Sequence, residues 1–219
     1  AYRRANVDVA IILGKDQKEI FPNHSPSIAI YSGEDVHNGP PQRAVYAPDS
    51  HVVHKCHPKL ATYLLETFQA NGFDLTDLLE WPENVWMERQ MKQKADYPVV
   101  PHAYSFVYHQ IMGDNPPPHV PVLMNLFYPP TQPSMARCIE FGRVLRDAIL
   151  AWPEDVRVAV IASGGLSHFV NDEEFDQDIL KKLASYDYEG LSAIPDGWFQ
   201  SGTSEIKIYS TVMVALQHT

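Results

Sequence analysis

The amino-acid sequence predicts an α/β fold in which a central, mostly parallel sheet is flanked by helices, in a single domain over residues 1–219. Short apolar, β-branched runs that end at a glycine or in a polar loop are typical of buried parallel strands. Segments with apolar residues at helical spacing alternate with these runs, the order expected of strands joined by crossover helices. The chain is also long enough to bury one good-sized core.

The first half of the chain is predicted to contribute two strands and one helix. Residues 7–14 form an apolar, β-branched run that a glycine closes, and residues 28–31 form a second such run. Residues 33–48 are rich in Gly, Pro, Asp and Asn, and we therefore expect a loop there. Residues 57–71 carry apolar side chains at helical spacing and run into an Asn-Gly stop, which predicts an amphipathic helix.

The second half is predicted to add two strands and a long helix. Residues 81–96 are charged and carry Trp and Met, and we interpret them as a helical excursion. Residues 121–127 form a strand, after which a proline-rich loop excludes both a helix and a central strand. A helical stripe then begins after Ser134, a suitable cap, and ends at Trp152. Residues 156–162 form a further apolar strand.

The composition excludes two classes of partner. The formal net charge is −10, and the Lys and Arg residues are scattered, so nucleic acid is not expected to bind. With 45% hydrophobic and 20% charged residues and only short apolar runs, no membrane span is predicted.

Cys56 and Cys138 lie far apart and lack paired metal-ligand spacing, which argues against a disulfide framework and a zinc site. A reducing cytoplasm fits this pattern best.

One loop carries the clearest chemical signal. In open α/β sheets, reactive side chains gather at the carboxyl ends of the strands. The segment Ser-Gly-Gly-Leu-Ser-His, residues 163–168, directly follows a predicted strand, and its two glycines permit a tight turn that delivers His168 to that edge. An imidazole titrates near neutrality, so it could accept a proton from a substrate and return it. The alternative is a loop histidine held by local hydrogen bonds.

Two further segments hold candidate site residues. His102 precedes a predicted helix within residues 101–112, where it could serve a site or simply cap the helix by bonding its exposed backbone groups. His109, in the same segment, is expected on the helix surface. Glu205 lies within residues 201–209, just before an apolar C-terminal segment, and could be a metal ligand or a solvated carboxylate in a first helical turn.

Residues 159–169, 101–112 and 201–209 together resemble the class III extradiol ring-cleaving dioxygenases of the protocatechuate 4,5-dioxygenase beta-subunit type. The resemblance covers most of the chain, from the first predicted strand to the C-terminus. It implies extradiol (meta) cleavage of a catecholic or aminophenolic ring by dioxygen at a non-heme Fe(II) site, in a homo- or hetero-oligomer. His168 would then be the acid/base residue, His102 would hold the bound oxygen or a substrate oxygen, and Glu205 would be the metal carboxylate.

The sequence departs from that family where the first predicted strand ends. The family presents Asp-His there, with the histidine on iron, whereas this chain has Asp-Gln, so Gln17 takes the ligand position. An amide oxygen is a poorer iron ligand than imidazole. His24 could substitute, although its surroundings also fit an ordinary turn.

The family's other iron histidine comes from a segment ahead of this strand, and we expect residues 1–219 to lack that N-terminal segment. The alternative function is therefore a non-catalytic subunit or binding module paired with an active partner. A third possibility is a related reaction with another metal.

Other histidines are predicted to serve the fold. His51, His54 and His57 recur at a spacing of three, which suits one face of a helix and invites a metal site. The neighbouring Asp-Ser pair and Pro58 instead favour a junction between a loop and a helix, where polar residues are expected. Likewise, Glu34, Asp35 and His37 are predicted to lie in a solvated loop.

Overall fold

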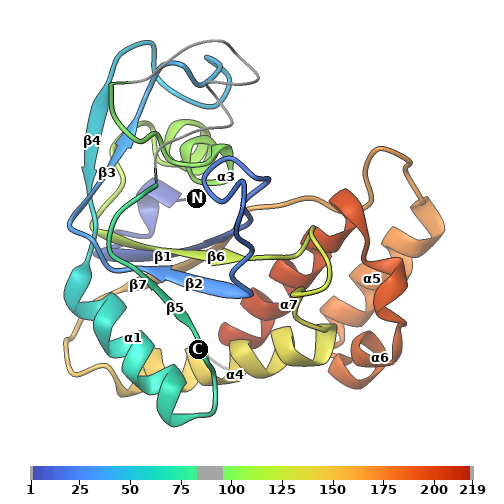
Figure 1. Cartoon of the computed structure of the whole chain (residues 1–219). Coiled ribbons are helices and arrows are strands. Elements are labelled where there is room, and N and C mark those ends of the chain that lie inside the picture. The colour runs from blue at the N-terminus through green and yellow to red at the C-terminus, as the bar shows by residue number, and fades with distance from the viewer. Residues whose placement is uncertain (1, 83–95, 218–219) are drawn as a thin grey trace.

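The computed structural model, which describes residues 2–82 and 96–217, contains the predicted mostly parallel sheet (Figure 1). Its strand order is β5-β2-β6-β1-β7. The three neighbours β6, β1 and β7 are parallel, whereas β2 runs antiparallel to β6 and parallel to β5. The strands are β1 (Val9–Gly14), β2 (Ile28–Tyr31), β5 (Thr76–Leu78), β6 (His119–Met124) and β7 (Val158–Ala162).

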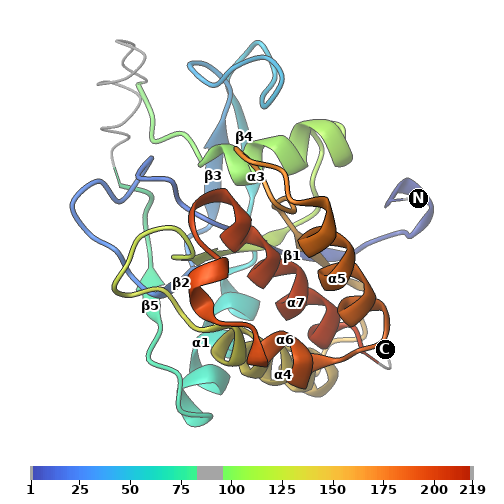
Figure 2. The same ribbon diagram turned by 90° about the vertical axis from the view of Figure 1, so that its right-hand side faces the viewer.

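Helices cover both faces of the sheet, as Figures 1 and 2 show. Below it in Figure 1 lie α1 (Pro58–Ala70), α4 (Met135–Ala151) and α7 (Ile206–Ala215). Above it lie α3 (His102–Phe106), its continuation Val107–Ile111, and a hairpin of β3 (Asp35–Asn38) and β4 (Val52–Lys55). Helices α5 (Glu173–Ala184) and α6 (Tyr188–Ala193) close one end beside α4 and α7, and short 3-10 turns span Tyr2–Arg4, Asp196–Trp198 and Ser201–Glu205.

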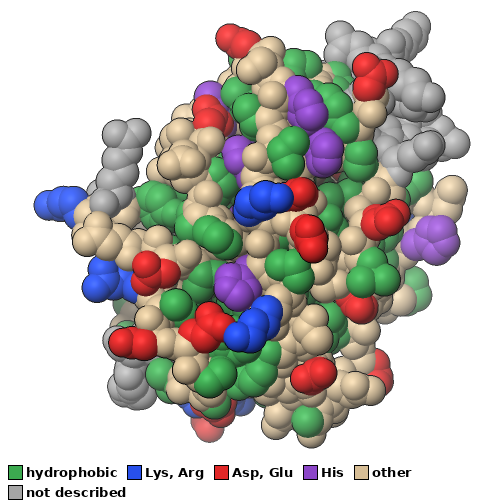
Figure 3. Space-filling view, turned by 90° about the vertical axis from the view of Figure 1, so that its left-hand side faces the viewer, with side chains coloured by type: hydrophobic (Ala, Val, Ile, Leu, Met, Phe, Trp, Pro, Cys, Tyr) green, Lys and Arg blue, Asp and Glu red, His purple; other side chains and the backbone are tan. Residues whose placement is uncertain are grey.

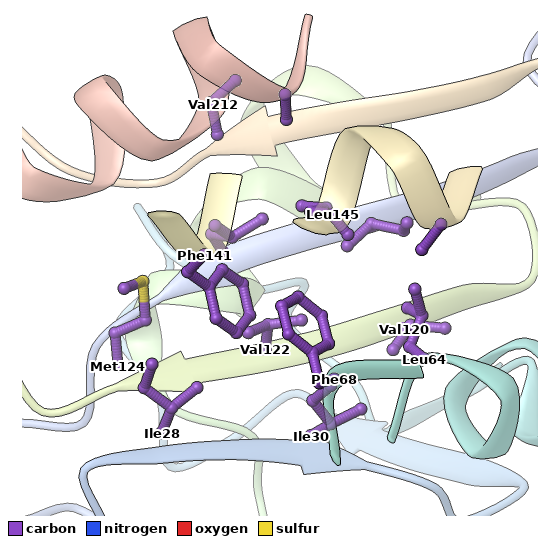
Figure 4. Packing of buried hydrophobic residues seen from close by; sticks show 14 of the residues in the cluster. Ile28, Ile30, Leu64, Phe68, Val120, Val122, Met124, Phe141, Leu145 and Val212 are labelled. Carbon is purple, nitrogen blue, oxygen red and sulfur yellow. The ribbon is translucent and has the colours of Figure 1, made fainter. Parts of the chain in front are cut away.

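Strand β1 shows why this arrangement is stable. Its side chains alternate between the two faces, so Ile11 packs with the helices below the sheet and Ile12 with α3 above it. Both are fully buried, which explains why the strand reads as one continuous apolar run. Below the sheet, the rings of Phe68 in α1 and Phe141 in α4 stack with centroids 4.0 Å apart, next to Val122 of β6 (Figure 4). This double-sided core fixes the edge of the sheet on which the candidate site is built.

Most predicted elements are present with small shifts at their ends. The predicted helix over residues 57–71 is α1, and Ser134 caps α4 by accepting a hydrogen bond of 3.2 Å from the backbone of Arg137. Strand β6 begins at His119 and therefore includes Pro121. Pro121 pairs with Ile12 of β1, whereas the pairing of β6 with β2 begins only after Pro121. The proposed excursion over residues 81–96 lies almost wholly outside the described residues.

The prediction of a loop over residues 33–48 was wrong in part, because this segment contains β3. In the pairing of β3 with β4, Val36 lies opposite His54. The side chain of Val36 is fully buried in the core cluster that also contains residues of α3. Asp35 and His37 thus belong to a strand rather than to a solvated loop. Neither strand has a clear apolar alternation of its own, so the pairing depends on the tertiary contact of the hairpin with α3.

The histidines at spacing three do not share a helix face. His51 is exposed, His54 is buried on β4 against Tyr108, and His57 caps α1 by accepting a hydrogen bond of 3.1 Å from the backbone of Leu60. A strand lies where a helix face would be needed to bring them together. None of the helices in the described part of the chain is long and apolar enough to cross a membrane.

Candidate active site

The candidate site is built where three loops meet at one edge of the sheet. Residues 15–27 follow β1, residues 125–134 follow β6, and residues 163–172 follow β7. Because these three strands are parallel neighbours, their carboxyl ends lie on the same edge. The 3-10 turn Ser201–Glu205, which leads into α7, and the first residue of α3 complete the site.

The loop after β7 holds His168 in a defined orientation. The ring Nδ1 lies 2.7 Å from the carbonyl oxygen of Leu166. A carbonyl only accepts, so Nδ1 carries the proton and Nε2 of the neutral ring is left as a proton acceptor. Nε2 lies 3.8 Å from Oε1 of Glu205. The structure thus brings together two candidate residues that lie 37 positions apart in the sequence.

Two glycines make this approach possible. A Cβ on Gly164 would lie 2.9 Å from the Cβ of Glu205, so only glycine lets the loop approach α7 this closely. A Cβ on Gly202 would overlap the ring of His168. The hydroxyl of Tyr209 adds a hydrogen bond of 2.6 Å to the carbonyl of Gly164. The two close approaches at glycine, together with the hydrogen bond from Tyr209, therefore fix the distance between the histidine loop and the start of α7.

A second set of hydrogen bonds secures the same loop from behind. Asp176 of α5 accepts from the backbone and the hydroxyl of Ser167, at 2.9 and 2.8 Å. The hydroxyl of Ser167 in turn accepts from the backbone of Asp172 at 2.8 Å. Next to His168, Phe169 adopts a positive φ of 73°, a conformation that costs a non-glycine residue energy and is kept only where the surroundings impose it.

Glu205 faces an ammonium group inside the protein. The Nζ of Lys15, the first residue after β1, lies 2.6 Å from Oε1 of Glu205. Lys15 is 1% exposed and Glu205 is 9% exposed. Burial lowers the pKa of Lys15 below its ordinary value, while the nearby carboxylate opposes this shift. The alternative prediction of a solvated carboxylate at Glu205 is therefore wrong, because the residue is buried and forms an ion pair with Lys15.

His102 is held by a carboxylate that the sequence did not point to. The backbone N–H of His102 donates to Oε2 of Glu19 at 2.9 Å, and its ring Nδ1 donates to Oε1 of the same residue. Burial alone would lower the pKa of His102, but the hydrogen bond and the charge of Glu19 outweigh it, so the pKa is raised. The alternative in which the imidazole caps the helix is wrong, since Glu19 caps the first turn and the imidazole is one of its donors.

The loop after β1 is folded around Asp16. Its carboxylate accepts from the backbone N–H groups of Glu19, Ile20 and Phe21, at 2.8 to 3.1 Å. Burial raises the pKa of Asp16 to about 6, although these hydrogen bonds oppose the shift. Gln17 is half-buried in this loop and His24 is exposed, and within the described residues no hydrogen bond or ion pair joins either to Glu205.

Sequence reasoning therefore missed Lys15, Glu19 and Gly202. A charged residue directly after a buried strand is a usable signal for Lys15, because that position points to the open edge of the sheet. Nothing local marks Glu19 or Gly202, whose partners come from distant segments. His109, predicted on a helix surface, is half-buried and pairs with Asp114 at 2.9 Å.

Two clusters of side chains outside the site also contain histidines. On the face that carries the hairpin, where several histidines are visible in Figure 3, Nδ1 of His37 lies 3.0 Å from Nε2 of His51, which stacks on Tyr97. Beneath the hairpin, Nε2 of His119 lies 2.7 Å from the hydroxyl of Tyr108, and burial lowers the pKa of His119 to about 4. In the part of the chain that the structure describes, no three His, Cys, Asp or Glu side chains are grouped so that they could hold a metal ion.

Comparison with known proteins adds three findings. The family model described as the catalytic LigB subunit of aromatic ring-opening dioxygenase matches residues 3–215. A gallate dioxygenase of Pseudomonas putida is 41% identical over 60 residues, a stretch that spans 24% of this chain and only 18% of that relative. The crystal structure of an uncharacterized protein from Escherichia coli K12 superposes with a TM-score of 0.48 at 14% identity, covering 96% of this chain and 76% of that one.

Proposed function

Because the chain belongs to the LigB family of catalytic subunits of aromatic ring-opening dioxygenases, we propose that it opens a catecholic or aminophenolic ring by extradiol cleavage with dioxygen, at a non-heme Fe(II) site. Residues 1–219 would form one catalytic domain of this kind. The observation that carries the proposal is the orientation of His168, whose Nδ1 is fixed on the carbonyl of Leu166 and whose Nε2 lies 3.8 Å from the buried Glu205 at the open edge of the sheet.

The proposed work of the side chains is proton handling and substrate binding. A catechol binds as an anion after losing phenolic protons, and Nε2 of His168 is placed to accept one and later return it. The ring of His102, which Glu19 keeps in place, would donate to a substrate oxygen. Burial lowers the pKa of His102, the charge of Glu205 adds to that of Glu19 in raising it, and the charge of Lys15 opposes the rise.

An iron centre needs more donors than these residues supply. In this class of enzyme two histidines and a carboxylate hold Fe(II) and leave positions open for substrate and oxygen. Here Glu205 is a suitable carboxylate, but an ammonium lies 2.6 Å from it, the nearby imidazole is the proposed acid/base residue, and Gln17 offers only an amide. The described residues do not by themselves fit the metal, so the steps proposed for this chain involve protons and substrate alone.

A non-catalytic subunit paired with an active partner is the second candidate, and the ion pair between Lys15 and Glu205 favours it. In that case the pocket would bind a ring or stabilise the partner without performing chemistry. Oligomerisation suits both candidates, because Phe169 and Val170 beside His168 are 76% and 82% exposed. A cytoplasmic location is also proposed, since both cysteines are free and buried.

Oxygen uptake tests the proposed reaction. Protein reconstituted anaerobically with Fe(II) is mixed with catechols, gallate-like acids and aminophenols, and oxygen consumption is followed with an electrode. We expect turnover of at least one substrate, which His168→Ala lowers by about a hundredfold or more, the usual contribution of an acid/base residue. His51→Ala, which changes an exposed histidine ahead of β4 and outside the candidate site, is the matched control. Absence of oxygen consumption with the whole panel, together with no stoichiometric iron, would favour the non-catalytic subunit.

A further inference from the structure

The ammonium group of Lys15 is an unusual feature for the centre of a metal-dependent family. It lies at the carboxyl end of β1 with 1% of the residue exposed. Its charge partner is Glu205, at 2.6 Å, and no second acceptor for the ammonium is found among the described residues. The ring of Phe127 lies 5.0 Å from Nζ and closes another side. The group is thus aimed at one carboxylate.

Glu205 needs a cation in this position. Its side chain is 11% exposed, and a buried carboxylate without a positive partner is strongly destabilising. His168 is too far for a hydrogen bond, at 3.8 Å, and its Nδ1–H is already used by Leu166. Within the described residues, Lys15 is therefore the group that compensates the charge of Glu205.

We infer that Lys15 is a built-in cation that competes with a divalent metal ion for Glu205. The ammonium and a metal ion would use the same carboxylate, and two positive charges within about 4 Å repel each other strongly where water is excluded. Metal binding would require Lys15 to leave the carboxylate, and this requirement weakens the affinity for metal. The inference rests on the proposed function only in taking Glu205 as the metal carboxylate.

Replacing Lys15 with a neutral residue of similar length tests this competition. Purified full-length protein is titrated with Mn²⁺ without any aromatic substrate, and free Mn²⁺ is measured by electron paramagnetic resonance. We expect Lys15→Met to bind Mn²⁺ about ten- to a hundredfold more tightly than the unchanged protein, the range seen when groups next to metal ligands are altered. Adding Glu205→Gln to this variant should abolish the gain.

Lys18→Met is the matched control, because Lys18 lies three residues further along the same loop and has separate partners. Its Nζ donates to Ser25 at 2.9 Å and lies 4.5 Å from the ring centroid of Tyr128. This variant should bind Mn²⁺ like the unchanged protein. If Lys15→Met does not fold, as judged by circular dichroism and thermal unfolding, Lys15→Gln keeps a polar end group and is expected to show the same gain.

Three results would overturn the inference: unchanged or weaker Mn²⁺ binding by folded Lys15 variants, an equal gain in Lys18→Met, or a gain that persists with Glu205→Gln. The titration involves no turnover, so it is independent of the oxygen-uptake experiment. Tighter Mn²⁺ binding with no oxygen consumption would support the competition and reject the proposed reaction. Oxygen consumption with unchanged Mn²⁺ binding would support the proposed reaction and reject the competition.

Discussion

Replacing Gly202 with alanine should disturb both the stability of the protein and the position of His168. A Cβ at residue 202 would overlap atoms Cδ2 and Nε2 of the His168 ring, so either the ring or the turn must move. Overpacking of this kind costs about 1–3 kcal/mol. Alanine also lowers the conformational entropy of the unfolded chain, which stabilises the folded protein by about 0.4–1 kcal/mol. We therefore expect a net destabilisation of about 1–2 kcal/mol, or a fall in Tm of about 3–6 °C for a chain of this size.

Gly197→Ala is the matched control, since an added Cβ at residue 197 would have no atom within 4 Å. Thermal and urea unfolding give the change in stability, and the ring resonances of His168 in heteronuclear NMR report whether the imidazole moves. If the ring swings away easily, the loss of stability will be small but the resonances will shift. Gly202→Ala that matches Gly197→Ala in both measurements would refute the packing argument.

Three further changes test the site and the fold. Glu19→Gln removes the charged acceptor of His102 and should lower the free energy of unfolding by about 1–2 kcal/mol. Because the pKa of His102 is raised in the folded protein, this loss of stability should be complete below about pH 6.5 and should shrink as the pH rises through the folded pKa. Equal losses in urea unfolding at pH 6 and at pH 8.5 would contradict this expectation. Phe68→Ala empties the stack with Phe141 and should cost about 3–5 kcal/mol in urea unfolding, whereas a loss below 1 kcal/mol would mean that the core re-forms around the gap. Ser134→Ala removes the cap of α4 and should cost about 1 kcal/mol, with Ser134→Thr retaining most of the stability.

The two loops that follow β1 and β7 explain how one sheet edge can serve either proposed role. Their backbone is fixed by Asp16 in one loop and by Asp176 beneath the other, so neither depends on a bound metal for its shape. The fold of the site can therefore persist whether Glu205 is paired with Lys15 or with an ion. This separation of fold from chemistry is why family membership establishes the architecture of this chain but leaves its reaction to experiment.

The sequence by itself determined the elements whose residues bury one continuous stripe. Strands β1 and β2, helix α1 and helix α4 were all predictable, because alternation and helical spacing record burial locally. The loop of His168 was also predictable, since a glycine pair after an apolar strand marks the open edge of a sheet, although β7 itself is an edge strand and only partly buried. Resemblance to a known family then suggested roles for His102 and Glu205 that local patterns left open, and these roles stay predictions.

Only the tertiary structure decided which charges meet. Lys15 and Glu205 are 190 positions apart, and Glu19 and His102 are 83 apart, so neither pair leaves any periodic trace in the sequence. The pairing of β3 with β4 was hidden for the same reason. Burial of a single side chain can be read from its neighbours along the chain, but electrostatic partnership depends on distances through space, and the packing of β1, β7, α3 and α7 sets those distances.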